Sequence, residues 1–196
     1  AYLVHGHGSQ IMTASYIPWI LLFIFKIHNK VNIINFSCLA LLVGLQLQRG
    51  HIQIAYYTWM ISSLFILVSF IFSYKRDIKA ASINFFVAIG SLLTGLLISL
   101  SIYYPVLNYT AHSVRGVNNG GYGIQNATQW SLHIKEFLTF IIPYSYGFGG
   151  QNYWGFLPFT DFPNYIGIFI IFLAIIGFFK AKMNKKYKIF FILVIF

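Results

Sequence analysis

Long apolar runs alternate with short polar turns along most of the chain. The runs cover residues 11–27, 31–48, 52–74, 80–104, 165–179 and 189–196. As α-helices, the first four would reach about 26 to 37 Å, enough to cross a hydrocarbon layer of about 30 Å. Their apolar residues are continuous rather than alternating, and lipid offers backbone groups no hydrogen-bond partner. The pattern therefore predicts transmembrane helices and not the strands of a β-barrel.

The composition agrees with a membrane protein. Hydrophobic residues make up 58% of the 196 residues and charged residues 8%, whereas about a quarter of a soluble domain is charged. The net charge of +10 does not indicate nucleic-acid binding, because the basic residues fall in short bursts between apolar runs rather than on one face. The single cysteine, Cys38, lies inside an apolar run and excludes both an internal disulfide and a metal site built on cysteines.

The basic turns predict the orientation of the helices. Three alternate turns hold ten of the thirteen Lys and Arg residues, and each turn lies one pair of helices after the previous one. These ten residues are Lys26, Lys30, Lys75, Arg76, Lys79, Lys180, Lys182, Lys185, Lys186 and Lys188. The positive-inside rule places such turns in the cytoplasm. The polar segments with the most distinctive residues are then expected on the opposite, extracytoplasmic side.

The predicted fold is an all-α, polytopic bundle of about five complete transmembrane helices and a truncated sixth, with a large, partly ordered extracytoplasmic loop. Residues 1–104 are expected to form the first four helices, 105–164 the loop, and 165–196 the fifth helix, a basic turn and the sixth helix. The chain does not begin with Met and ends within an apolar run, so we expect it to be a fragment of a longer protein.

The long loop contains a segment rich in glycine and aromatic residues, residues 144–155. Two interpretations remain open for it. Tyr and Trp commonly form a belt at the membrane interface. Alternatively, aromatic faces and amide groups line a cleft for a sugar or a lipid headgroup, because such clefts combine apolar walls with a few polar groups. The candidate lining residues are Gln151, Asn152, Tyr153 and Trp154.

Charged and histidine residues of the outer side give weaker signals. Asp161 precedes Pro163 and the fifth run, where a helix-capping or turn role competes with a carboxylate that orients a hydroxyl or a metal. His5 and His7 lack nearby acidic ligands, so we predict no metal site and no cofactor, although the use of a divalent metal stays open. The segment 132–142 predicts a short interfacial helix that Pro143 ends.

Arginine is the residue best suited to bind a phosphate on this side. Its planar fork of donors matches phosphate oxygens. Arg49 and Arg115 are therefore candidate ligands of a phosphate or diphosphate headgroup, with His51 beside the first of them. For Arg49 the alternative is that its side chain extends to lipid headgroups from the end of a helix.

The outer motifs together resemble the bacterial YfhO-type membrane proteins. The resemblance rests on Gly-His-Gly-Ser-Gln at 6–10, Gln-Arg-Gly-His-Ile-Gln-Ile-Ala-Tyr-Tyr at 48–57, Ser-Val-Arg at 113–115, and Tyr-Trp-Gly-Phe-Leu-Pro-Phe-Thr-Asp-Phe-Pro-Asn-Tyr-Ile-Gly at 153–167. It spans residues 5 to 180, and the order of the motifs carries it more than any single motif.

This resemblance implies a glycosyltransferase of the GT-C class in the bacterial cytoplasmic membrane. Such enzymes transfer a sugar from a polyprenyl-phosphate donor to an acceptor glycan of the cell envelope, on the extracytoplasmic side. The catalytic carboxylate of that class lies in the first outer loop, which we expect upstream of residue 1, and Asp161 is only a weak substitute. The alternatives are a transporter or flippase of a lipid-linked intermediate, and a non-catalytic membrane assembly partner.

Overall fold

The computed structural model describes residues 8–109, 112, 128, 131–147, 150–157, 164–180 and 182–195. Within these residues the chain is all-helical and contains no β-strand, in agreement with the predicted fold class. It divides into two compact units. The helical unit comprises Ala1–Asn108 and Asn184–Phe196, and the loop unit comprises Tyr109–Met183. The predicted boundaries at 104 and 164 therefore differ from the observed division, which groups the fifth apolar run with the loop.

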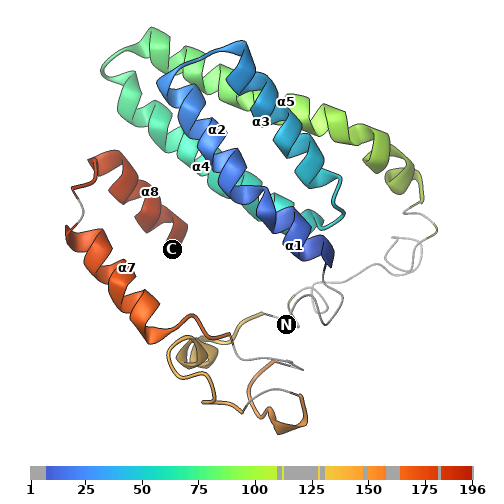
Figure 1. Cartoon of the computed structure of the whole chain (residues 1–196), viewed down its shortest axis with the longest axis vertical. Coiled ribbons are helices and arrows are strands. Elements are labelled where there is room, and N and C mark those ends of the chain that lie inside the picture. The colour runs from blue at the N-terminus through green and yellow to red at the C-terminus, as the bar shows by residue number, and fades with distance from the viewer. Residues whose placement is uncertain are drawn as a thin grey trace. The chain divides into compact units, whose positions relative to one another are not determined.

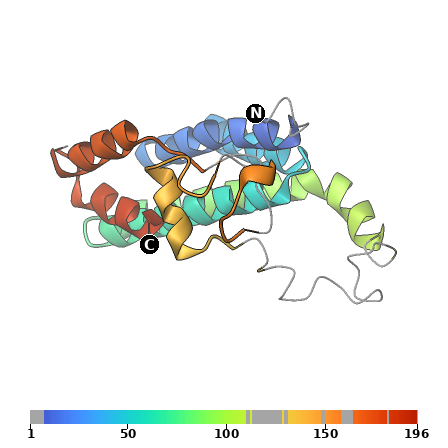
Figure 2. The same cartoon turned by 90° about the horizontal axis from the view of Figure 1, so that it is seen from below.

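The first apolar run forms two consecutive helices, α1 (Gly8–Ser15) and α2 (Ile17–Asn29). They follow one another along nearly the same line (Figures 1 and 2). The interruption at Tyr16 has a local cause in Pro18, which has no backbone N–H to donate to the preceding turn and sits in the first turn of α2. Ile20, Ile24 and Ile27 recur at helical spacing and form the buried face of α2.

Two further helices pack against this pair, α3 (Ile33–Leu47) and α4 (Ile52–Tyr74). The side chain of Asn32 caps α3 by accepting a hydrogen bond of 2.7 Å from the backbone N–H of Asn35. Between the two helices, Gly50 adopts a φ of 79°, a conformation that side chains with a Cβ rarely adopt. The turn at 48–51 therefore depends on glycine.

The helix α5 (Ile78–Tyr109) is longer than the sequence predicted. It begins after Asp77, whose carboxylate accepts a hydrogen bond of 3.0 Å from the N–H of Ala80. It also continues through Pro105, the residue expected to begin the loop. The prediction treated this proline as a helix end. Proline removes only one backbone donor, and here the helix runs one further turn before Tyr109.

The last helix, α8 (Lys185–Ile195), packs against α4 in the helical unit. Phe65 of α4 is almost fully buried and lies within 6.2 Å, centroid to centroid, of the rings of Phe25, Tyr187 and Phe190. This aromatic group joins α2, α4 and α8, and large rings of this kind bury much apolar area.

The basic segments of the helical unit lie at one end of it. Asn84, near the start of α5, donates a hydrogen bond of 3.1 Å to the carbonyl of His28, near the end of α2. The Nζ of Lys186, at the start of α8, is 2.9 Å from Nε2 of the same histidine. The sequence placed the adjoining basic turns on one side, and these contacts bring them together. We call this the basic end of the helical unit.

The loop unit contains two 3-10 helices, η3 (Ile134–Phe140) and η4 (Gly150–Asn152), and the α-helix α7 (Ile168–Lys180). The short helix predicted at 132–142 is thus present but tighter and shorter than expected. The backbone N–H groups of Ile166 and Gly167 donate to the carbonyl of Phe140, which fixes the start of α7 to the end of η3.

Three of the described helical stretches are long and apolar enough to cross a membrane: Gly8–Asn29, Ile52–Tyr74 and Ile78–Tyr109. The remaining apolar helices are shorter. The 15 residues of α3 and the 13 residues of α7 reach only about 22 and 20 Å. The structure therefore has the helices of a membrane protein, while a total of five complete spans stays a prediction.

Candidate functional site

The predicted cleft residues lie together in the loop unit. Gln151 and Asn152 belong to η4, and Tyr153 and Trp154 follow it directly. The side chains of Gln151, Asn152 and Trp154 are exposed, and 68% of Trp154 is accessible. Its indole meets the ring of Tyr146 edge-on, with centroids 5.0 Å apart. The surface thus offers an aromatic face beside two amide side chains, which we call the Trp154 surface.

A buried carboxylate fixes the backbone beneath this surface. Glu136 of η3 is only 2% exposed. Its Oε1 accepts a hydrogen bond of 2.5 Å from the hydroxyl of Tyr153 and one of 2.8 Å from the N–H of Phe156. The Tyr153 oxygen in turn accepts 2.8 Å from the N–H of Leu157. Charge-assisted hydrogen bonds of this kind are stronger than neutral ones. Glu136 therefore anchors the segment 153–157 to η3.

The hydroxyl of Tyr153 makes contacts that the sequence did not indicate. It faces Glu136 and the backbone of Leu157 rather than an open cleft. Burial raises the pKa of the Tyr153 hydroxyl above its ordinary value, and the hydrogen bond to Glu136 raises it further. The hydroxyl is therefore protonated at neutral pH and donates to the carboxylate. Tyr153 supports the surface from behind, and it is Trp154 that is presented to solvent.

Two glycines allow the close approach of these segments. A Cβ at Gly155 would clash with the carboxylate of Glu136 and the hydroxyl of Tyr153. Gly147 has a φ of 88°, and a Cβ there would clash with the backbone carbonyl of Asn152. Gly147 and Gly155 therefore serve close packing between backbone and side chains.

One cationic side chain, that of Lys135, also lies beside the aromatic residues next to the Trp154 surface. Phe156 stacks on His133, with centroids 4.2 Å apart, and the Nζ of Lys135 lies 5.4 Å from the Phe156 centroid. Phe156 in turn contacts Tyr146 at 5.7 Å. The arrangement supplies positive charge beside aromatic faces, a combination that suits a ligand with apolar and anionic parts.

Of the predicted phosphate ligands, the structure describes Arg49 and His51 but not Arg115. Arg49 is exposed beyond the end of α3, with its guanidinium 6.0 Å from the ring centroid of Tyr16. His51 caps α4, since its Nδ1 accepts a hydrogen bond of 3.4 Å from the N–H of Ile54. Arg115 and Asp161, together with His5 and His7, lie outside the described residues. Among the residues that are described, no group of three His, Cys, Asp or Glu could hold a metal ion.

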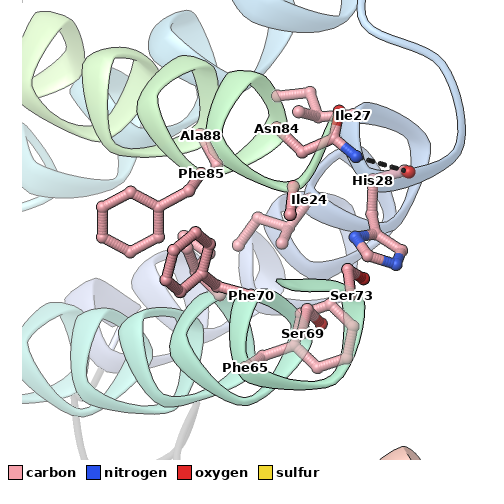
Figure 3. Close-up of a pocket in the computed structure, with 12 residues that line it drawn as sticks. Ile24, Ile27, His28, Phe65, Ser69, Phe70, Ser73, Asn84, Phe85 and Ala88 are labelled. Atoms are coloured by element: carbon pink, nitrogen blue, oxygen red, sulfur yellow. Dashed lines mark hydrogen bonds between the residues drawn. The ribbon is translucent and has the colours of Figure 1, made fainter. Parts of the chain in front are cut away.

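The helical unit contains a cavity that the sequence did not indicate. It lies at the basic end, between α2, α4 and α5 (Figure 3). Its polar lining comes from His28, Ser69, Ser73 and Asn84, and the rest is apolar. Its volume of about 20 Å³ compares with the 10–15 Å³ that one water requires by this measure. Ser69 and Ser73 are one helical turn apart on α4, but their sequence gave no sign of the partners from α2 and α5.

A second set of buried polar groups lies at the opposite end of the helical unit. Gln46 is fully buried, and its Nε2 donates hydrogen bonds of 3.1 Å to the carbonyl of Thr13 and 3.0 Å to the hydroxyl of Thr58. These bonds join α1, α3 and α4 and satisfy the Nε2 of Gln46 in an apolar surrounding, whereas its Oε1 has no partner among the described residues. The glutamine is a structural tie between helices.

No family model, curated protein or solved structure matches this chain.

Proposed function

We propose that this chain belongs to a GT-C-type glycosyltransferase of the bacterial cytoplasmic membrane. The Trp154 surface is the observation that carries the proposal. It combines an exposed indole with exposed amide groups on a backbone that Glu136 holds in place. Flat aromatic faces pack on the apolar faces of sugar rings, and amides pair with hydroxyl groups. The sequence resemblance to YfhO-type proteins supports the same assignment.

In the proposed arrangement five helices cross the membrane completely, with the basic turns in the cytoplasm and the loop unit outside. Arg49, His51 and Arg115 bind the phosphate of a polyprenyl-phosphate-linked sugar, and Gln151, Asn152 and Trp154 contact the sugar or the acceptor glycan. Three helices of sufficient length and the clustered basic segments support this arrangement. The positive-inside rule then gives the orientation.

The proposed reaction is a transfer at the anomeric carbon. The bond from that carbon to the donor phosphate oxygen breaks, and a bond to an acceptor hydroxyl oxygen forms. The polyprenyl phosphate leaves with the bonding electron pair, and the hydroxyl proton passes to a base. Glu136 does not fit the role of base, because it is buried and its Oε1 already accepts two hydrogen bonds. We expect the base in another outer segment.

The test uses the full-length gene product, purified in detergent, with polyprenyl-phosphate sugars and cell-envelope glycans. Consumption of the lipid-linked sugar is followed for the wild type, Trp154→Ala and Trp19→Ala. Trp19 is the matched control, because it is also an exposed tryptophan, on α2. We expect Trp154→Ala to lower kcat/KM by about tenfold or more, as loss of an aromatic stacking contact commonly does.

Equal activity of both variants would contradict the role of the Trp154 surface. Activity that survives both Arg49→Ala and Arg115→Ala would contradict the phosphate assignment. If the folded wild-type protein consumes no donor, the proposal that it is a glycosyltransferase is wrong. Transfer of intact donor between the leaflets of a vesicle would then indicate a flippase.

A further inference from the structure

Lys186 is a half-buried cation that has no acidic partner among the residues that the structure describes. Its Nζ approaches the Nε2 of His28 to 2.9 Å and lies 4.6 and 5.6 Å from the ring centroids of Tyr187 and Phe65. Asp77 is the single acid in the sequence of the helical unit, and its carboxylate caps α5. Within the described residues, Lys186 therefore has neutral neighbours and no counter-ion.

The position of Lys186 on its helix adds to this imbalance. The first turn of α8 carries Lys185, Lys186 and Lys188 and no acidic residue. The N-terminus of a helix bears a partial positive charge, which favours anions and disfavours cations. Three lysines at such a position are repelled by the positive end of the helix dipole and by one another. A bound anion would be attracted by all of these positive charges and would offset the repulsion.

The neighbouring cavity supplies a second, independent sign of a missing polar ligand. Ser69 lines it together with His28, and Figure 3 shows both side chains among those that line the cavity. Ser69 is only 3% exposed, and its hydroxyl has no hydrogen-bond partner in the part of the chain that the structure describes. Buried hydroxyl groups nearly always have a partner. The cavity has room for water rather than for a larger group, so water can link this hydroxyl to an anion held outside the cavity.

We propose that the basic end of the helical unit binds the phosphate group of an anionic membrane lipid, with Lys186 as the direct ligand. His28 orients the ammonium group through its Nε2, and Lys185 and Lys188 contribute long-range attraction. A lipid suits the site better than free phosphate, because α8 exposes four successive apolar residues, Phe191, Ile192, Leu193 and Val194, on which acyl chains can pack. The proposal does not depend on glycosyl transfer.

The test measures lipid binding to the full chain by native mass spectrometry. The protein is purified in a neutral detergent and titrated with phosphatidylglycerol, and with phosphatidylcholine for comparison. Lys186→Gln is compared with Lys185→Gln, which removes the same charge from the neighbouring, exposed position. We expect Lys186→Gln to weaken phosphatidylglycerol binding about tenfold, and Lys185→Gln to weaken it less than about threefold. A direct charge-assisted hydrogen bond contributes more to binding than a long-range attraction does. Lys186→Arg should retain binding.

Equal weakening by Lys186→Gln and Lys185→Gln would overturn the proposal, since it would indicate a diffuse basic patch. No preference for phosphatidylglycerol over phosphatidylcholine would overturn it as well. A further titration adds inorganic phosphate to the protein with bound lipid. Displacement of the lipid by excess phosphate, dependent on Lys186, supports the shared phosphate site. Binding of phosphate without any binding of phosphatidylglycerol contradicts the lipid as its source. Circular dichroism and gel filtration confirm that each variant is folded.

Discussion

Glu136 and Lys186 are two charged residues with very different sets of polar partners. The carboxylate of Glu136 is buried but receives hydrogen bonds from Tyr153 and Phe156. The ammonium of Lys186 is half-buried and meets a neutral histidine. Buried charges persist in proteins when hydrogen bonds or counter-ions replace the lost water. We therefore infer that the first charge maintains structure and that the second is completed by a ligand.

The role of Glu136 leads to a prediction for the loop unit. Glu136→Ala would leave the part-buried N–H of Phe156 and hydroxyl of Tyr153 without this acceptor, at a cost of up to about 1–3 kcal/mol for each group. We expect faster hydrogen exchange of the amides of residues 153–157, measured by mass spectrometry. Glu136→Gln keeps an acceptor oxygen and should show a smaller increase. Unchanged exchange in Glu136→Ala would show that Glu136 does not anchor the segment.

Among the helices, α3 and α5 make the closest contact that depends on glycine. A Cβ at Gly95 of α5 would lie 2.6 Å from Cγ1 of Val43 and 2.7 Å from the carbonyl oxygen of Ala40. Beyond this point, the hydroxyl of Tyr103 donates 2.9 Å to the carbonyl of Leu47. Small residues at such crossings let helices approach closely in a membrane, where packing rather than the hydrophobic effect drives association.

We predict that Gly95→Ala destabilises the helical unit by about 1–3 kcal/mol, because the added methyl group forces the backbones apart. The midpoint of thermal unfolding in detergent should fall. Gly177→Ala in α7 is the control, since a Cβ there meets no atom within 4 Å. Alanine also favours a helix over glycine by up to about 1 kcal/mol. A Gly95→Ala variant as stable as Gly177→Ala would contradict this packing.

The sequence predicted the positions of the helices better than the contacts between them. The run 52–74 coincides with α4, because apolar continuity and polar ends define a helix within one segment. The break at Tyr16 and the extension past Pro105 were missed, since proline ends a helix in some contexts and is accommodated in others. The cavity and the anchoring role of Glu136 were also missed. Both arise from contacts between segments, which no local pattern encodes.

At the scale of the whole molecule, the basic end and the Trp154 surface belong to different units. The proposed orientation places them on opposite sides of the membrane, because the basic turns follow the positive-inside rule. One end would then interact with anionic lipid in the cytoplasmic leaflet, and the other with lipid-linked sugar outside. Each surface can be tested without the other.

This orientation gives a prediction that the single native cysteine makes simple to test. In a Cys38→Ser background, one new cysteine is introduced as Asn152→Cys and another, separately, as Lys79→Cys. Both positions are exposed. A membrane-impermeant thiol reagent added to intact cells should label the first variant and not the second, because the reagent reaches only the outer side. Permeabilised cells should label both. Labelling of Lys79→Cys alone in intact cells would reverse the proposed orientation.

The distances along the chain between bonded partners also bear on the order in which the protein matures during synthesis. Glu136 is separated from Tyr153 and Phe156 by 17 and 20 residues, so this network can close soon after its segment leaves the ribosome. The contact between His28 and Lys186 can form only after a further 158 residues have been made. Until then, Phe65 lacks the aromatic rings of α8. The packing of α2 and α4 is thus completed only after α8 has been made, and a stall in translation before α8 would leave their apolar surface exposed to chaperones and proteases.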